Sequence, residues 1–375
     1  TPVAITFLIK KTNDSDNKAD IFYYDIGDYL SREEKLEKLK DLDNIKNIKF
    51  KKIKPNRYGD WINKRGEDFN KFIPLSIDNN FNIYSKSFFA IQSVGLVTGR
   101  DSYMYNFFKS ELQSKINRSI KYYNDLLETI EDKNNYNFED SEKNIQWTRA
   151  LKRSFINNKK IKFNKSLIRE ASYRPFNKQL LYAEPRLIES YGKIKNVFLD
   201  NNIVITIPKP SSNKEFSCLI TDKITDFGYL GGTQALPLYY YEAEEEKEKI
   251  KSKYVIKDIS AEKDNNGYQL FDYRIKRKFA ISDYIMKLAN EKYGRVCEED
   301  IFYYVYGILH SPKYRTKYAN DLKKMLPHIP LLEKKELFFH FADAGRKLAL
   351  LHLNYENQKP LKEIKISGLE SDNFR

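Results

Sequence analysis

Cysteine is almost missing from this sequence of 375 residues, which holds only Cys218 and Cys297. Neither has a partner at the spacing of metal ligands, and two distant thiols do not make a disulfide framework. We therefore expect two buried free thiols in a reducing cytoplasm and no structural metal site.

Long hydrophobic runs are missing as well. No apolar stretch approaches the ~20 residues that a membrane-spanning helix needs, and no signal peptide is found. Residues 1–9 are too short and too rich in β-branched side chains for either, and they predict a buried strand. A sequence that begins inside a strand is expected to be a piece of a longer chain, in the cytoplasm and without a membrane partner.

The motifs of common active sites are also absent. The sequence has neither the phosphate-binding loop of nucleotide hydrolases nor a paired-glycine dinucleotide fingerprint, and Gly231–Gly232 predicts a turn. His340 and His352 lie twelve residues apart and cannot share a metal ion. Like His310 and His328, they are expected to be core or surface residues.

Asp222 and Asp226 invite the interpretation of a metal-dependent nuclease, because they are four residues apart. A helix cap or a pair of turn residues is the better interpretation of this spacing. We expect no catalytic residue, no metal and no cofactor in this chain.

Positive charge, by contrast, is in excess. Lys and Arg number 66 against 52 Asp and Glu, which gives a net charge of +14. With 41% hydrophobic residues the chain can form a packed core. A basic folded chain favours a polyanionic partner, nucleic acid before an anionic membrane, although a solubilising surface is the alternative.

Hydrophobic periodicity predicts an α+β fold, a mixed-sheet region followed by a helical C-terminal layer. Ser31 and Glu34 fit a capping box at a helix start, and strand 21–26 is expected to form a hairpin with strand 1–9. Strands are predicted over 1–9, 21–26, 50–55, 88–97, 203–207 and 216–220, and helices over 31–42, 110–130, 149–155, 275–293, 298–309, 314–325 and 335–353.

Four segments follow from this pattern. Residues 1–55 form a connector, 56–241 an α+β region, 242–267 a charge-dense linker and 268–375 a helical subdomain. No repeat of 20–50 residues is found, so a solenoid is not expected.

Basic side chains beside aromatic and amide groups form four clusters, at 99–106, 147–153, 173–182 and 209–214. Lys, Ser and backbone amides hold phosphates, whereas Arg, Asn and Gln pair with base edges. Each cluster alone equally fits a solvated face over packed aromatic rings. The predicted DNA-binding residues are Arg100, Tyr105, Asn106, Trp147, Arg149, Lys152, Arg153, Tyr173, Arg174, Lys178, Lys209, Ser212, Lys214 and Gln234.

Two further stretches leave alternatives open. Gln234 follows Gly231–Gly232, where contact with DNA and a place in a turn before a buried strand are both possible. The aromatic run Phe302–Tyr306 favours a core position over a base-stacking platform, because it lies in the middle of a helix.

Several motifs resemble a known family. They are Gly95–Asp101 with Tyr105–Phe107, Tyr173–Phe176 with Leu181–Tyr182, Glu299–Pro312 with Tyr314–Arg315, Leu326–Pro330, and Gly345–Leu353. Together they are similar to the C-terminal specificity region of type ISP restriction-modification enzymes. The motif at 299–315 is the most specific of them.

In that family one polypeptide carries a nuclease, an ATP-driven translocase, an N6-adenine methyltransferase and a target-recognition domain. The resemblance implies that residues 1–55 end the methyltransferase domain. It implies double-stranded DNA and the other domains of the polypeptide as partners, with S-adenosylmethionine, ATP and Mg²⁺ serving the parent enzyme. This chain lacks the Phe-x-Gly-x-Gly and Asn-Pro-Pro-Tyr motifs of the methyltransferase, so no catalytic role is carried over.

The resulting prediction is a target-recognition domain that grips a short asymmetric duplex, with its cations gathered on a single surface. Two alternatives remain. One is a docking module whose aromatic helices hold neighbouring domains. The other is a metal-dependent nuclease built around Asp222 and Asp226.

Overall fold

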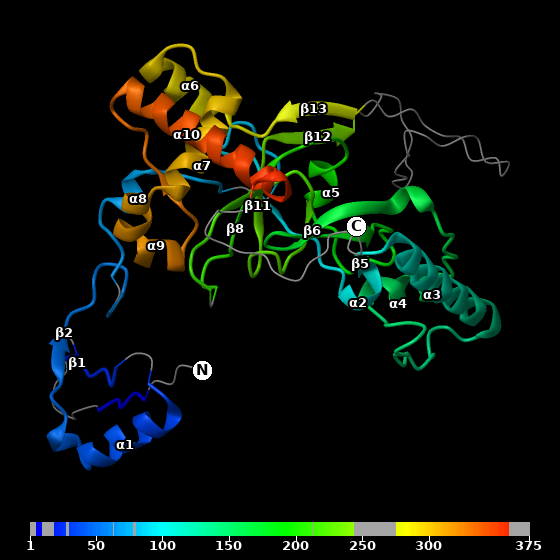
Figure 1. The fold of residues 1–375 in the computed structure, drawn as a ribbon. Helices are drawn as coiled ribbons and strands as arrows, with labels where there is room; N and C mark the ends of the chain where they lie inside the picture. The colour runs from blue at the N-terminus through cyan, green and yellow to red at the C-terminus, as the bar shows by residue number, and fades with distance from the viewer. Residues whose placement is uncertain are drawn as a thin grey trace. The chain divides into compact units, whose positions relative to one another are not determined.

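The computed structural model describes residues 5–9, 19–27, 30–62, 64–77, 80–212, 214–243 and 275–359. Its contacts divide the chain into two units, Thr1–Arg65 and Gly66–Arg375 (Figure 1). Most of the predicted linker 242–267 lies outside the described residues.

Unit 1, Thr1–Arg65, is small. Strand β1 (Ile21–Tyr23) pairs antiparallel with β2 (Lys51–Ile53), and helix α1 (Arg32–Leu42) and the short helix η1 (Ile45–Asn47) lie between them in the chain. The capping box is confirmed, because Ser31 and Glu34 each accept the other's backbone N–H.

The predicted hairpin of 1–9 with 21–26 is wrong. Residues 5–9 form no strand, and Ile21–Tyr23 pairs with Lys51–Ile53 instead. No described residue of unit 1 is buried. An apolar strand needs a packed face to hold it, and the described part of this unit, which has only the two-stranded sheet β1-β2, offers none to residues 5–9.

Unit 2, Gly66–Arg375, contains two four-stranded sheets among its described residues. The first has the order β10-β6-β7-β5, with β10 parallel to β6 and the other pairs antiparallel. The second, which we call the central sheet, has the order β4-β11-β8-β9 and is antiparallel. The first sheet comprises β5 (Tyr105–Asn106), β6 (Ile168–Arg174), β7 (Asn177–Tyr182) and β10 (Ile224–Thr225); the central sheet comprises β4 (Ser93–Val94), β8 (Val204–Ile207), β9 (Leu219–Thr221) and β11 (Gln234–Pro237).

Two strand pairs complete the described sheets. They are β3 (Ile73–Pro74) with β14 (His328–Ile329), and β12 (Tyr239–Ala243) with β13 (Ile275–Phe279). The second pair corrects the predicted helix 275–293, which begins only at Asp283. Residues Ile275–Phe279 are held as a strand because they pair antiparallel with Tyr239–Ala243 over all five positions.

The helices otherwise follow the prediction closely. In α3 the residues at helical spacing, Leu112, Ile116, Ile120, Tyr123 and Leu127, are all buried, and α10 has the predicted bounds. The predicted helix 314–325 is two helices, divided at Tyr318. The α-helices of unit 2 are α2 (Asp101–Met104), α3 (Lys109–Thr129), α4 (Arg149–Ile156), α5 (Ile194–Val197), α6 (Asp283–Tyr293), α7 (Glu298–His310), α8 (Pro312–Lys317), α9 (Ala319–Lys324) and α10 (Lys335–Leu353); the short helices are η2 (Phe69–Lys71), η3 (Lys165–Leu167) and η4 (Tyr355–Asn357).

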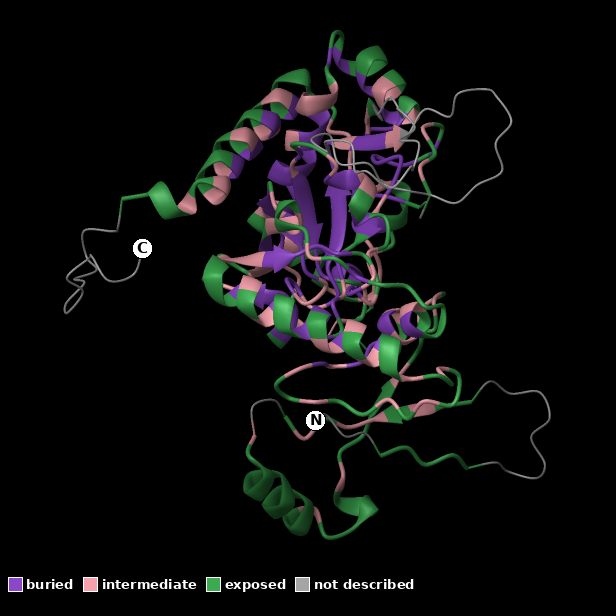
Figure 2. Cartoon of the chain, turned by 90° about the vertical axis from the view of Figure 1, so that its right-hand side faces the viewer, coloured by how far each residue is buried: buried purple, intermediate pink, exposed green. Residues whose placement is uncertain are grey.

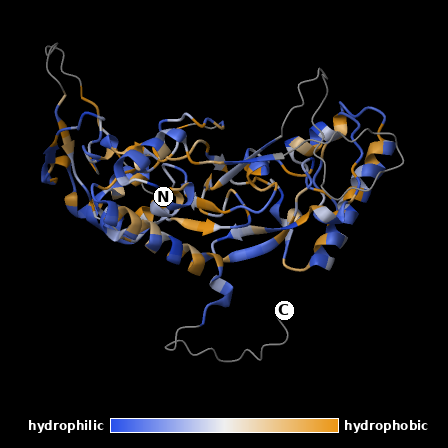
Figure 3. Ribbon diagram, turned by 90° about the horizontal axis from the view of Figure 1, so that it is seen from above, coloured by the Kyte–Doolittle hydropathy of each residue, from blue (hydrophilic) through white to orange (hydrophobic). Residues whose placement is uncertain are grey.

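The central sheet separates two hydrophobic cores, and its strands are among the most buried parts of the chain (Figure 2). Ile205 and Leu236 belong to a core shared with helices α6–α10, whereas Val204 and Ala235 belong to a core shared with α3 and α4. Neighbouring residues of one strand therefore face opposite cores. The long helices carry hydrophobic and hydrophilic residues in turn, as expected for helices with one buried face (Figure 3).

Candidate nucleic-acid interface

A tight connection, Asp226–Thr233, joins β10 of the first sheet to β11 of the central sheet. The backbone N–H groups of Gly232 and Thr233 both donate to the carbonyl oxygen of Phe227, at 2.9 and 2.8 Å. Gly231 and Gly232 have φ values of +76° and +85°, which only glycine adopts readily. The predicted turn at these glycines is confirmed.

Two of the predicted clusters, 99–106 and 173–182, meet Asp226 at the start of this connection. Nη1 of Arg174 donates to Oδ1 of Asp226 (2.8 Å), and Nη2 lies 3.6 Å from Oδ2 of Asp101. The hydroxyl of Tyr105 donates to Asp226 (3.1 Å), and that of Tyr173 donates to Asp101 (3.2 Å). We call these five residues the arginine–carboxylate cluster.

Burial governs the ionisation of this cluster. Desolvation, followed by the nearby charge of Asp101, raises the pKa of Asp226, and this outweighs the opposing effects of the Gly228 N–H and of Arg174. Burial also raises the pKa of the Tyr105 phenol well above its usual range. Tyr105 is therefore protonated at neutral pH and acts as a hydrogen-bond donor.

An open cavity of about 480 Å³ lies beside the cluster. Its lining combines backbone groups of two turns with polar side chains, and it comprises Leu96–Ser102, Gln146, Arg174 and Asp226–Gly228. Gly95 permits the close approach of the two turns, since a Cβ there would lie 2.6 Å from the carbonyl oxygen of Asp226. Gly99 lies in the left-handed region with φ +67°.

Arg100 was expected on the surface, and the structure places it inside. Its side chain is 2% exposed and lies over the ring of Tyr103, with 5.1 Å from Cζ to the ring centroid. None of its three guanidinium nitrogens has a hydrogen-bond partner among the described residues. Burial lowers the pKa of Arg100 to about 10, so it remains charged at pH 7.

The other end of the connection carries lysines. The stems of Lys209 and Lys214 pack on the two glycines: a Cβ on Gly232 would lie 2.6 Å from Cδ of Lys209, and one on Gly231 would lie 3.2 Å from Cδ of Lys214. Between these lysines, the N–H of Ser211 donates to the carbonyl oxygen of Lys323 at the end of α9 (2.8 Å).

Lys209, Lys214 and Lys323 are exposed, and none forms an ion pair within the described part of the chain. We call them the lysine patch. Ser212 is half-buried and its hydroxyl accepts the N–H of Lys214 (3.2 Å). Sequence reasoning missed Lys323, because its place depends on a contact between a loop and a helix that are distant in the chain. Its position in the last turn of a basic helix was the available signal.

Helix α4 begins beside the Gly99 turn. A Cβ on Gly99 would lie 3.1 Å from Cγ2 of Thr148, which caps α4 by accepting the N–H of Leu151. Arg149 is ion-paired with Glu189, Lys152 lies over the ring of Phe138 (5.2 Å), and Arg153 is exposed.

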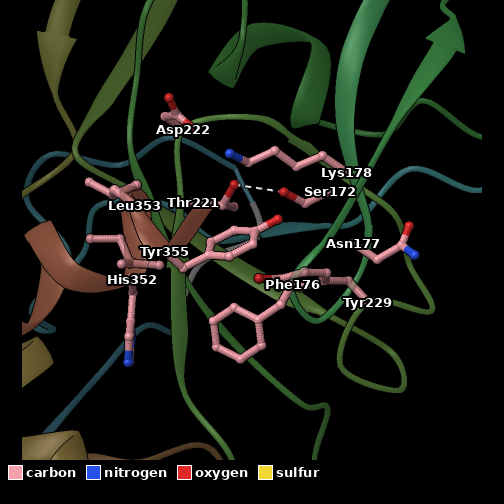
Figure 4. Close-up of a pocket in the computed structure, with 11 residues that line it drawn as sticks. Ser172, Phe176, Asn177, Lys178, Thr221, Asp222, Tyr229, His352, Leu353 and Tyr355 are labelled. Atoms are coloured by element: carbon pink, nitrogen blue, oxygen red, sulfur yellow. Dashed lines mark hydrogen bonds between the residues drawn. The ribbon is translucent and has the colours of Figure 1, made fainter. Parts of the chain in front are cut away.

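A second, smaller pocket lies between the turn of β6 and β7 and the end of α10 (Figure 4). Lys178 is ion-paired there with Glu356 (2.9 Å) and lies over the ring of Tyr355 (4.8 Å). The hydroxyls of Ser172 and Thr221, which both line the pocket, are hydrogen-bonded to each other (2.7 Å). Ser172, Thr221 and Lys178 are thus already engaged in hydrogen bonds or an ion pair.

Other predicted contact residues lie in the interior or in local networks. Trp147 packs among Tyr123, Phe138 and Phe155, and Gln234 is buried with its amide donating to the carbonyl oxygen of Gly232 (3.0 Å). Trp147, Gln234, Tyr105 and Arg100 are therefore buried, although a surface position was expected for predicted DNA contacts. Their rings and aliphatic stems fill the core instead. Asn106 is half-buried and accepts the N–H of Phe108 (2.8 Å).

The carboxylates of Asp222 and Asp226 have different surroundings. Asp222 lines the pocket of Figure 4 and pairs with Lys223 (3.3 Å), whereas Asp226 faces Arg174. Within the described ranges, no three His, Cys, Asp or Glu side chains are grouped so that they could hold a metal ion. None of the helices described there is long and apolar enough to cross a membrane.

Comparison with known proteins identifies a family model that matches most of the chain. The type ISP C-terminal specificity domain model matches residues 87–374. No curated protein sequence matches the chain significantly.

Solved structures that are similar to the chain include three complexes with DNA or a DNA mimic. They are a nuclease-deletion mutant of the type ISP restriction-modification enzyme LlaGI in complex with a DNA substrate mimic (32% identity, TM-score 0.70), a DrdV–DNA complex (28%, 0.73), and the ATP-dependent type ISP restriction-modification enzyme LlaBIII bound to DNA (33%, 0.72). The similarity covers 94%, 91% and 92% of this chain, but only 25%, 31% and 21% of those chains.

Proposed function

The chain belongs to the type ISP C-terminal specificity domain family, and from this membership we propose that it binds double-stranded DNA at a specific sequence. In this role it serves as the target-recognition domain of a restriction-modification enzyme. Adenine methylation and DNA cleavage are then carried out by other domains, to which this chain presents the site.

The convergence at the Asp226–Thr233 connection is the observation that carries the proposal. The connection joins an open cavity with an arginine at one end to three lysines at the other, and none of these lysines forms an ion pair with a described residue. Duplex recognition needs both kinds of group, because phosphates are held by cations and bases are identified by planar hydrogen-bonding side chains. The solved relatives are themselves described as bound to DNA or to a DNA mimic.

The two ends of the connection differ in their electrostatics. Arg149, Arg174 and Lys178 are ion-paired within the chain, so part of their charge is already neutralised. The lysine patch has no ion pair among the residues that the structure describes, and we assign phosphate binding to it. The net charge of +14 adds a long-range attraction for any duplex.

The test is binding of the 375-residue chain to a fluorescent duplex at increasing salt concentrations. We expect Lys209→Ala with Lys214→Ala to weaken binding to all sequences alike. The slope of log K against log salt should fall by about two units, because each phosphate contact contributes about 0.9. Lys347→Ala is the matched control, since this exposed α10 lysine lies outside the patch.

Two results would contradict the proposal. One is a wild-type chain that shows no salt-dependent duplex binding. The other is a control variant, Lys347→Ala, that changes the slope as much as one patch lysine does.

Chemistry and cofactors are placed outside this chain by the same proposal. S-adenosylmethionine, ATP and Mg²⁺ would serve the methyltransferase, translocase and nuclease of a longer polypeptide in the cytoplasm. The solved relatives are chains of which this one covers a third or less, which leaves room for such domains.

Unit 1 supports a second function, docking onto another part of the enzyme. Its described residues include none that is buried, and it exposes Phe22, Leu36, Leu39, Ile45 and Phe50. Exposed apolar groups mark interaction sites when they form a contiguous patch, and these five residues all lie within one small unit. We propose that they pack against a neighbouring domain of the same polypeptide.

A further inference from the structure

We infer that Arg174 recognises a guanine of the bound DNA through O6 and N7 of that base, and that Asp101 and Asp226 position it for this contact. The inference rests on the proposed function and deepens it. It names one residue that determines specificity and the base that it selects.

The guanidinium of Arg174 is held on one side and free on the other. Nη1 donates to Asp226 (2.8 Å) and to the carbonyl oxygen of Tyr173 (2.6 Å), which uses both of its hydrogens. In the described structure Nε has no hydrogen-bond partner, and Nη2 has only the 3.6 Å contact with Asp101. The side chain is 40% exposed and lines the open cavity. The edge formed by Nε and Nη2 can therefore donate two parallel hydrogen bonds.

The plane of the guanidinium is fixed before any ligand binds. It lies over the ring of Tyr173, with 3.8 Å from Cζ to the ring centroid. On another side it meets Gly228, where a Cβ would lie 3.1 Å from Cζ. Asp226 is itself held by the Tyr105 hydroxyl and by the N–H of Gly228 (2.7 Å). A guanidinium oriented in this way loses little freedom on forming a bidentate contact.

The flanking carboxylates favour a base edge over a phosphate. Asp101 and Asp226 both lie within 4 Å of Arg174, so the group as a whole carries no net positive charge when both are ionised. A phosphate would be repelled by these carboxylates. A guanine edge is neutral, and it presents two acceptors, O6 and N7, at the spacing of two guanidinium N–H groups.

The experiment selects bound duplexes from a pool with a randomised central segment, using the 375-residue chain. The wild-type chain is expected to enrich a motif that contains at least one guanine. Arg174→Ala and Arg174→Lys should enrich the same motif with that single guanine position relaxed, because neither side chain can form the bidentate pair. Lys209→Ala with Lys214→Ala is the control and should keep every position of the motif while binding more weakly.

A second measurement leaves the protein unaltered and so does not depend on the folding of any variant. Placing 7-deazaguanine at the assigned position removes only N7 and should weaken wild-type binding by about tenfold, the effect of losing part of one bidentate pair. For Arg174→Lys the same replacement should have little effect.

The possible failures are distinguishable. If the wild-type chain enriches no sequence, the proposed function itself is wrong. If it enriches a motif that Arg174→Lys selects unchanged, or a motif without guanine, the function stands and the role of Arg174 is overturned.

Discussion

Arg100 places a positive charge in the interior of unit 2 without an acceptor for its guanidinium nitrogens in the described structure. Its favourable contact is with the ring face of Tyr103. A buried cation of this kind costs free energy, since it has lost its hydration and gained no ion pair. The lowered pKa of Arg100 reports the same penalty.

The first prediction at the scale of residues is that Arg100→Met stabilises the chain. Methionine follows the same path with a similar volume and carries no charge, so the free energy of unfolding should rise by about 1–3 kcal/mol. Urea unfolding followed by circular dichroism measures this change. Arg153→Met, at an exposed position on α4, is the control and should change the stability by less than about 0.5 kcal/mol.

A loss of stability in Arg100→Met would mean that the guanidinium has a partner that offsets its burial. The residue would then be part of the framework of the cavity. The role of the neighbouring Arg174 does not depend on this outcome, because Arg174 has its own acceptors.

Sequence reasoning at this scale could identify residue types but not their partners. Arg174 is predicted as a DNA contact from its aromatic and amide neighbours, and the structure places it in the lining of the open cavity. The hydrogen bond of Arg174 to Asp226 depends on the parallel pairing of β10 with β6. These strands are far apart in the chain, so no local sequence pattern predicts their pairing. Arg100 was expected on the surface because charged side chains are mostly exposed, and here the packing of a turn overrides that tendency.

At the scale of elements, α7 and α10 form a close helix pair. Gly307 and Gly345 face the partner backbones, and a Cβ on Gly345 would lie 2.0 Å from the carbonyl oxygen of Tyr303. The two helices can approach this closely because neither carries a side chain at the crossing. Figure 1 shows α10 lying across α7 in the C-terminal layer.

We therefore predict that Gly345→Ala destabilises the chain by about 2 kcal/mol or more, the cost of overpacking a close contact. The direction of the change in the free energy of unfolding is the informative result. On an exposed helix face Gly→Ala stabilises by roughly 0.5–1 kcal/mol, whereas at this crossing we expect it to destabilise. Thermal and urea unfolding provide the measurement. Ala344→Gly, one residue away on an exposed position of α10, is the control and should cost only about 1 kcal/mol.

A stabilised Gly345→Ala would show that the two helices are further apart than described. DNA binding offers an independent check. The crossing lies in the helical layer and not at the Asp226–Thr233 connection, so folded Gly345→Ala protein should bind duplex with unchanged salt dependence.

Elements with a strong period were predictable and elements made by long-range pairing were not. The face of α3 formed by Leu112, Ile116 and Ile120 follows from helical spacing alone. The sequence predicts strand β13 as the first part of a helix, because five residues are too few to distinguish the hydrophobic period of a strand from that of a helix. Its partner β12 lies on the far side of a long segment that sequence alone does not bridge.

At the scale of the whole molecule, the central sheet contributes residues to both hydrophobic cores. The sequence suggests an α+β region, 56–241, and a separate helical subdomain, 268–375, and this sheet packs against helices of both. The apolar run 203–207 was predicted as a strand, and its burial on both faces explains why it shows no alternation of polar residues. The C-terminal helices share one core with this sheet and with Phe69 and Phe88. They are one layer of unit 2 and not a body with a core of its own.

Unit 1 gives the prediction at this scale. Leu36 and Leu39 on α1 are 55% and 46% exposed, so Leu36→Gln with Leu39→Gln should leave the melting temperature of the 375-residue chain unchanged. In the longer polypeptide that we propose, the same pair should lower it, because the leucines would be buried against a neighbouring domain. Scanning calorimetry of both forms is the measurement.

A lower melting temperature in the 375-residue chain itself would contradict the docking proposal. It would show that these leucines already pack within the chain. Glu37→Gln, an exposed substitution on the same helix, is the control for effects on α1 alone.

The loop that carries Lys209 and Lys214 packs on Gly231, Gly232 and α9, and this packing should affect the rate at which the protein binds DNA. The backbone N–H of Ser211 is bonded to α9 and the stems of Lys209 and Lys214 pack on the two glycines, so less ordering remains when the protein meets a duplex. Capture should therefore be fast and limited by diffusion in the field of the protein, and it should slow steeply as salt is added. A side chain on Gly232 would displace the stem of Lys209, and we expect this to lower the association rate constant for duplex DNA.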